Sequence, residues 1–132
     1  MLKKDTVRQD KTILVIEDEI PLQNAIRLKL EKGGFQALTA RSVNQAMNHL
    51  KDVKGIDVIW LDHYLLGKDN GLDFVVNLKN DKKFKKIPIF VVSNTVSSEK
   101  VKSYLSLGVN KYYTKANYRL DQIIKDMNKV LK

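Results

Sequence analysis

The segment DVIWLD, residues 57–62, places four consecutive apolar side chains between two aspartates. A short apolar run of this kind predicts a strand that is buried on both faces, as strands of a parallel sheet are. Asp62 ends the run, and a bare carboxylate beside a buried strand is costly unless a cation accompanies it. The segment therefore predicts a parallel sheet with a chemically important carboxylate at its edge.

Further short runs rich in β-branched residues alternate with longer stretches of helical spacing. This alternation is typical of strand and helix units that form a parallel sheet with helices on both faces. We expect strands at residues 13–16, 35–39, 57–61, 87–92 and 111–113, with five helices between and after them. The predicted fold is α/β, a doubly wound five-stranded parallel sheet in the order 2-1-3-4-5, which is a flavodoxin-like three-layer sandwich.

Residues at the expected helix ends agree with this division. Pro21 suits the first turn of the first helix, and Gly33-Gly34 ends that helix because glycine tolerates the left-handed conformation. Ser42 is a candidate N-cap of the second helix, and Gly108 closes the fourth.

Length and composition predict one domain, because 132 residues with 43% hydrophobic content suffice for one compact core. We expect residues 1–11 to be a polar lead-in and residues 12–132 to form the domain. The chain lacks cysteine, which excludes disulfides and thiolate metal sites. A signal-peptide pattern and a bilayer-spanning apolar segment are also missing from the sequence, so we expect a cytoplasmic location and no membrane partner.

The net charge of +9 raises the question of nucleic-acid binding. The basic residues are spread over the N-terminal residues, a run at 82–86 and the last helix, and aromatic residues do not alternate with them. This distribution is typical of solvated faces and argues against direct nucleic-acid binding.

Polar side chains follow four of the five expected strands. Glu17 and Asp18 come after the first strand, Asp62 after the third, Ser93 after the fourth and Lys115 after the fifth. Ligands of doubly wound sheets bind at these carboxyl ends. Carboxylates can hold Mg²⁺, a carboxylate facing the ion can attack phosphorus, and a lysine and a hydroxyl can neutralise phosphoryl oxygens.

Each of these residues alone has an ordinary explanation. An acid at a strand end is more often solvated or caps a helix, Ser93 alone suggests a turn or cap, and Lys115 alone suggests simple exposure. The second strand, at the sheet edge, ends in Arg41 without an acid. Four complementary groups on four different strands, with the edge strand omitted, favour a phosphoryl-transfer site.

The order and spacing of these motifs resemble the receiver domain of two-component response regulators, of the chemotaxis-regulator kind, over residues 11–131. The matching motifs are ILVIEDE (13–19) for the acidic pair, DVIWLDHYLLGKDNGLDFV (57–75) for the phosphoacceptor, IPIFVVSN (87–94) for the hydroxyl and GVNKYYTKA (108–116) for the lysine. Each motif is moderately specific, whereas their combined order is highly specific.

The resemblance implies a magnesium site around the phosphoacceptor. Asp62 would accept the phosphoryl group and bind Mg²⁺ together with Asp18. The backbone carbonyl of Tyr64 would complete the protein ligands, and Glu17 would act through metal-bound water. Glu17 stands where aspartate is commoner, which keeps the charge.

The resemblance also implies a switch. Ser93 and Lys115 would bind the phosphoryl group, and the ring of Tyr112 would move inward as Ser93 turns toward it. The altered surface would comprise the fourth helix, the fifth strand and the fifth helix. An ordinary strand aromatic is the alternative for Tyr112.

Several positions depart from the family pattern. Ala116 replaces the proline that usually follows the lysine through a cis bond, which before alanine would cost about 2.5–4 kcal/mol, so the loop is expected to differ. Leu66 replaces a frequent proline. The lifetime-tuning positions are Tyr64, Asn94 and Thr95, and we hypothesise that Tyr64 and Asn94 crowd the pocket and slow dephosphorylation.

The predicted function is thus a phosphoryl-accepting signalling switch rather than a turnover enzyme. Its partners would be a histidine kinase or phosphotransfer protein and a downstream protein or output domain, with a homodimer of the phosphorylated chain left open. A pseudo-receiver binding module and, less favoured, a small Mg²⁺-dependent phosphatase remain alternatives. We assign His49, Trp60 and His63 packing or surface positions without a chemical role.

Overall fold

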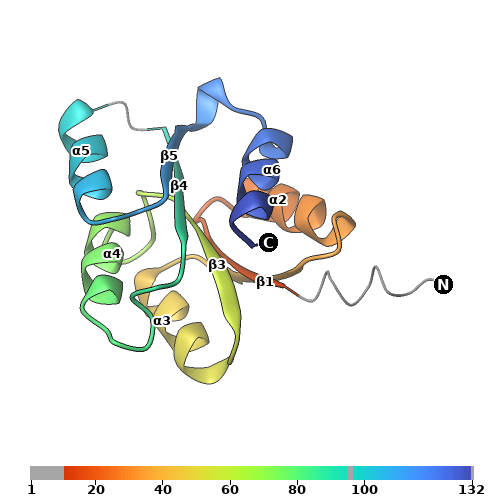
Figure 1. The fold of residues 1–132 in the computed structure, drawn as a ribbon. Helices are drawn as coiled ribbons and strands as arrows, with labels where there is room; N and C mark the ends of the chain where they lie inside the picture. The colour runs from red at the N-terminus through yellow and green to blue at the C-terminus, as the bar shows by residue number, and fades with distance from the viewer. Residues whose placement is uncertain (1–10, 95–96, 132) are drawn as a thin grey trace.

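The computed structural model describes residues 11–94 and 97–131 (Figure 1). Its strands pair in parallel in the order β2-β1-β3-β4-β5, which confirms the predicted fold. The strands are β1 (Thr12–Ile16), β2 (Gln36–Ala40), β3 (Ile56–Leu61), β4 (Ile89–Ser93) and β5 (Lys111–Thr114). Most of the expected N-terminal lead-in, residues 1–10, lies outside the described residues.

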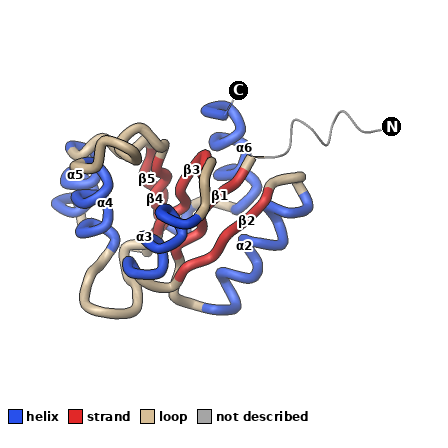
Figure 2. Tube along the Cα trace, turned by 90° about the horizontal axis from the view of Figure 1, so that it is seen from below, coloured by secondary structure: helices blue, strands red, loops and turns tan. Residues whose placement is uncertain are grey.

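Helices cover both faces of the sheet. Figures 1 and 2 show α2 and α6 on one face, and α3, α4 and α5 on the other. The helices are α2 (Ile20–Lys32), α3 (Val43–Asp52), α4 (Gly71–Lys79), α5 (Ser98–Ser106) and α6 (Leu120–Leu131). Among the described residues, none of these helices is both long and apolar enough to serve as a membrane span.

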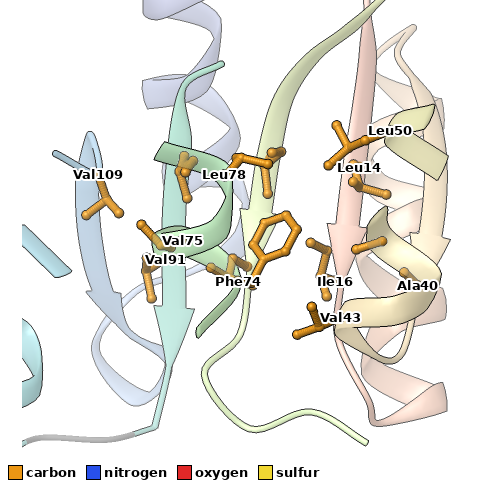
Figure 3. Packing of buried hydrophobic residues seen from close by; sticks show 14 of the residues in the cluster. Leu14, Ile16, Ala40, Val43, Leu50, Phe74, Val75, Leu78, Val91 and Val109 are labelled. Carbon is orange, nitrogen blue, oxygen red and sulfur yellow. The ribbon is translucent and has the colours of Figure 1, made fainter. Parts of the chain in front are cut away.

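Strand alternation divides the core into two layers. Leu14, Ile16 and Leu61 pack with Phe74 beneath α3, α4 and α5, in the cluster drawn in Figure 3. Trp60 points to the opposite face and packs with residues of α2 and α6, as expected for a residue one step along the strand.

Local signals at the helix ends were confirmed. The Ser42 side chain accepts a hydrogen bond from the backbone N–H of Gln45 at 3.2 Å and caps α3. Pro21 lies in the first turn of α2. Gly34 and Gly108 have φ angles of 91° and 92°, the left-handed region in which a side chain would be strained.

Each strand has at least one end that differs from the predicted range by one or two residues. Strand β4 begins at Ile89 rather than at residue 87, because Pro88 lacks an N–H for the ladder and contributes only its carbonyl, to Ile59. A short 3₁₀ helix, η1 (Lys115–Asn117), was not predicted and follows β5 directly.

The connection from β3 to α4 is held by a buried contact with α5. The N–H of Gly71 donates to the carbonyl of His63 at 2.8 Å, and the His63 Nδ1 lies 2.6 Å from the hydroxyl of Tyr104. Burial raises the pKa of Tyr104 and lowers the pKa of His63, so an uncharged hydroxyl and a neutral ring share this hydrogen bond. His63 therefore has the packing position expected for it.

The contact between His63 and Tyr104 requires a residue without a side chain at position 71, which is Gly71. A Cβ at this position would lie 2.6 Å from the Tyr104 hydroxyl and 2.7 Å from the carbonyl oxygen of Asp62. The first atom belongs to a fully buried side chain and the second to the backbone that carries the phosphoacceptor candidate. A larger residue would therefore displace the backbone at Asp62.

We predict that Gly71→Ala lowers the free energy of unfolding by about 1–3 kcal/mol, because of this overpacking. Urea denaturation measures the change. Gly33→Ala is the matched control, since its Cβ would come no closer than 3.4 Å to the Leu30 carbonyl and should change stability little. Equal stability of the two variants would contradict the steric argument.

Candidate functional site

Strand register brings the predicted site residues to one edge of the sheet. Ile16 of β1 is aligned with Leu61 of β3, so the next residues, Glu17 and Asp62, lie side by side. The N–H of Asp62 also donates to the carbonyl of Ile16 at 2.9 Å, which fixes the two strand ends together. The adjacency of the two carboxylates thus follows from backbone pairing alone.

Three carboxylates gather at this edge. Glu17, Asp18 and Asp62 each offer an oxygen within 4.8 Å of the others. Glu17 and Asp62 are buried, with 0% and 3% of their surface exposed, while Asp18 is half-buried. Buried carboxylates this close together repel one another and lose hydration, so they require a cation.

Lys115 supplies one positive charge to this cluster. Its Nζ lies 2.9 Å from Glu17 Oε1 and 3.3 Å from Asp62 Oδ2. It reaches them from η1 because Thr114 is aligned with Ser93 at the end of β5. Burial alone would lower the pKa of Lys115, but the two ion pairs outweigh burial and raise it. Lys115 is therefore charged and bridges both acids.

The single positive charge of Lys115 does not neutralise the negative charges of both buried acids, Glu17 and Asp62. Burial and the charge of Asp62 raise the pKa of Glu17 to about 7. Burial also raises the pKa of Asp62, against the opposing effects of Lys115 and of a hydrogen bond from Ser93. The remaining negative charge and the all-oxygen donor set fit a hard divalent cation such as Mg²⁺.

Ser93 and Tyr112 lie on the β4–β5 side of the cluster. Ser93 is fully buried at the end of β4, and Tyr112 is half-buried in β5. Burial raises the pKa of Tyr112, and a hydrogen bond with Ser93 opposes this rise. The Tyr112 ring also lies 5.7 Å from that of Tyr104, centroid to centroid. Ser93 thus connects Asp62 with an aromatic residue that contacts α5.

The candidate lifetime-tuning residues lie around the rim. Tyr64 is 51% exposed and packs edge-on against His63, with ring centroids 4.8 Å apart. Asn94 is exposed and lines a cavity of about 430 Å³ that Lys115 and Ala116 also line. Thr95 lies outside the described residues.

The segment around Ala116 adopts the 3₁₀ helix η1. No cis peptide bond occurs among residues 11–94 and 97–131, so Lys115–Ala116 is trans there.

Two polar residues of this site were not anticipated. Arg41, after the edge strand β2, donates from Nε to the carbonyl of Asp18 at 2.9 Å. Gln23 of α2 is buried and donates from Nε2 to the carbonyl of Glu17 at 2.9 Å. The sequence contains only weak signals for these two residues. Arg41 is a basic residue at a strand end, and Gln23 lies three residues before Ile26 on the buried stripe of α2.

Comparison with known proteins agrees with this geometry. The family model described as the response regulator receiver domain matches residues 13–128. The phosphate regulon transcriptional regulatory protein PhoB of Escherichia coli strain K12 is 32% identical over 105 residues, which cover 80% of this chain and 45% of PhoB. The chain thus spans less than half the length of this relative. The chemotaxis protein CheY1 of Helicobacter pylori strain 26695 is 28% identical over 78% of this chain and 83% of CheY1.

Solved structures are similar over nearly the whole chain. A response regulator receiver protein from Pseudomonas putida superposes with a TM-score of 0.85 at 24% identity, covering 91% of this chain and 97% of that one. The phosphorylated cyanobacterial phytochrome response regulator RcpA gives a TM-score of 0.77 at 26% identity, covering 92% and 91% of the two chains. The family model spans most of the chain, and this protein therefore belongs to the response regulator receiver domain family.

Proposed function

We propose that this receiver is a phosphoryl-accepting switch in which Asp62 takes a phosphoryl group with the help of Mg²⁺. The observation that carries the proposal is the buried Asp62 carboxylate, 3.3 Å from the Lys115 ammonium and clustered with Glu17 and Asp18. The similarity to RcpA, which was solved in a phosphorylated form, supports it. The proposed role is that of a signalling switch rather than a turnover enzyme, in keeping with its receiver domain family.

Asp18, Asp62 and the backbone carbonyl of Tyr64 would hold the metal, and Glu17 would act through a metal-bound water. Mg²⁺, when bound, neutralises charge on the transferring phosphoryl oxygens. The nucleophile would be the Asp62 carboxylate. The N–H of His63 donates to its Oδ1 at 2.7 Å and orients the carboxylate.

In the proposed step, a carboxylate oxygen of Asp62 attacks phosphorus as the bond between phosphorus and the donor's leaving group breaks. The leaving group departs with that electron pair and takes up a proton, and an acyl phosphate forms on Asp62. Lys115 then pairs with a phosphoryl oxygen, and the Ser93 hydroxyl donates to another.

The switch follows from this redistribution of contacts. Ser93 turns toward the phosphoryl group, the Tyr112 ring follows it, and the surface formed by α5, β5 and α6 changes. Moving a two-state equilibrium from 1:99 to 99:1 requires about 5.5 kcal/mol of differential stabilisation. The proposed source of this stabilisation is the set of new contacts that Ser93, Lys115 and the metal make with the phosphoryl group.

A histidine kinase or phosphotransfer protein would donate the phosphoryl group in a cytoplasmic pathway. The altered surface of the receiver would then control a downstream protein or output domain. Association of two phosphorylated chains is a further form of output. The assembled cluster of Asp18, Asp62, Ser93 and Lys115 favours this function over a pseudo-receiver, which would not need it.

We predict that incubation with Mg²⁺ and a small acyl-phosphate donor adds one phosphoryl group to the wild type and none to Asp62→Ala, as measured by intact mass. Asp69→Ala is the control, because it removes an exposed carboxylate from the same connection and should leave the adduct unchanged. An equal adduct on Asp62→Ala would refute the assignment of the phosphoacceptor.

We predict a pH-dependent gain of stability in Glu17→Gln without divalent cations. The pKa of Glu17 is 4.5 in the unfolded chain and is raised to about 7 in the folded chain. The protonated carboxyl therefore contributes its full stability below pH 4.5, and this contribution is lost as the pH rises through about 7. At pH 8 in a chelator, the variant should unfold with a free energy about 1–3 kcal/mol larger than that of the wild type.

Urea denaturation at pH 4 and pH 8 measures this difference, which should shrink at pH 4 and on addition of Mg²⁺ at pH 8. Glu31→Gln is the control, since Glu31 is exposed and its ion pair with Arg27 lies on the surface of α2. A variant less stable than the wild type at pH 8 would show that Glu17 is not a source of unfavourable charge.

We predict that Tyr64→Ala accelerates loss of the phosphoryl group, because the exposed ring restricts the approach of water to Asp62. The first-order decay rate should rise by up to about tenfold, the effect of 1.4 kcal/mol on a barrier. Val76→Ala, which truncates an exposed side chain of α4, should leave the rate unchanged. An unchanged decay rate in Tyr64→Ala would reject the crowding hypothesis.

A further inference from the structure

Arg41 connects the two loops that carry the proposed metal-binding oxygens. One loop follows β1 and contains Asp18, and the other follows β3 and contains Tyr64. We infer that Arg41 is a positioning residue that sets the separation of these loops for Mg²⁺, and that Gln23 supports the first loop from behind. The inference rests on the proposed function, because it concerns the same metal site.

The side chain of Arg41 holds the first loop. Its Nε donates to the carbonyl of Asp18 at 2.9 Å, in a partly buried position. This bond fixes the backbone from which the Asp18 carboxylate projects. A charged donor bonded to a carbonyl is among the stronger hydrogen bonds of a protein, and the planar guanidinium gives it a defined direction.

The main chain of Arg41 holds the second loop. Its carbonyl accepts from the N–H of Leu66 at 2.9 Å, and its N–H donates to Gln45 Oε1 of α3 at 2.7 Å. Ser42 and Leu66 form an isolated parallel bridge next to this bond. Leu66 is two residues beyond Tyr64, so the bond restrains the segment that offers the Tyr64 carbonyl.

The bond to the second loop depends on the backbone N–H of Leu66. A proline at this position would have no N–H to donate. Here the N–H is present and bonded to Arg41. Arg41 therefore contacts both loops, one through its side chain and the other through its main chain.

Gln23 supports the acidic loop from α2. The residue is 8% exposed, and its Nε2 donates to the carbonyls of Glu17 at 2.9 Å and Ala40 at 3.2 Å. The Ala40 carbonyl also accepts the N–H of Glu17 at 2.9 Å, the last bond of the β1–β2 pairing. Gln23 thus provides a hydrogen-bond donor for the Glu17 carbonyl at the point where the pairing of β1 with β2 ends. Its amide is neutral, so it holds the loop without adding charge.

Charge and positioning predict opposite results for Arg41. Arg41 is a cation close to a site for a divalent cation, so if only its charge mattered, its removal would strengthen Mg²⁺ binding. If Arg41 positions Asp18 and the Tyr64 segment, its removal weakens binding, because the oxygens are no longer held at the metal's distances. The sign of the change therefore separates the two effects.

The test is an NMR titration of the complete chain with MgCl₂, following the backbone amides of Asp18 and Asp62. Arg41→Met and Gln23→Met should each weaken Mg²⁺ binding about tenfold, as loss of residues that orient metal ligands commonly does. Arg27→Met is the control, since it removes the same charge from a surface ion pair of α2 and should leave the affinity unchanged. Thermal unfolding verifies that each variant is folded, and Gln23→Met tests the inference separately if Arg41→Met does not fold.

Unchanged or tighter Mg²⁺ binding in both folded variants, with normal binding in the wild type, would overturn the inference and leave the proposed function intact. Absence of Mg²⁺ binding in the wild type would overturn both. Weaker binding in Arg41→Met, despite the loss of a positive charge, would support the positioning role.

Discussion

The confinement of Glu17 and Asp62 at the ends of adjacent buried strands is the constraint on which the site depends. Both carboxylates are removed from water, and burial together with the charge of Asp62 raises the pKa of Glu17 to about 7. Lys115 compensates part of this charge. The folded chain thus retains an unfavourable arrangement of like charges, which a divalent cation can relieve.

The rest of the fold keeps this arrangement from relaxing. The backbone bond from Asp62 to Ile16 holds the two strand ends together, and apolar layers pack on both sides of the sheet. Arg41 and Gln23 donate hydrogen bonds to the carbonyls of the acidic loop, which oppose an outward movement of the two carboxylates.

The same packing connects the site with its surroundings. Ser93 lies between Asp62 and Tyr112, and the Tyr112 ring contacts that of Tyr104 in α5. The Tyr104 hydroxyl bonds His63, the residue that follows Asp62. Asp62 is therefore connected with α5 along two chains of contacts, one through β4 and β5 and one through His63.

The sequence by itself determined the elements and the chemical types at their ends. Apolar runs and turn residues located the five strands within two residues, because burial and backbone conformation are encoded locally. The motif order then indicated Asp62 and its partners, whose adjacency follows from strand order. Ser42 and Gly108 were recognisable for the same local reason.

Only the tertiary structure decided which side chains support the site. Arg41 bonds the carbonyl of Asp18 and Gln23 that of Ala40, which are distant in sequence, and Gly71 is required by the Tyr104 hydroxyl from another helix. The η1 turn that delivers Lys115 also has no strong sequence signal. Such contacts depend on the distances between loops after the layers have packed, and a one-dimensional pattern of residue types does not contain those distances.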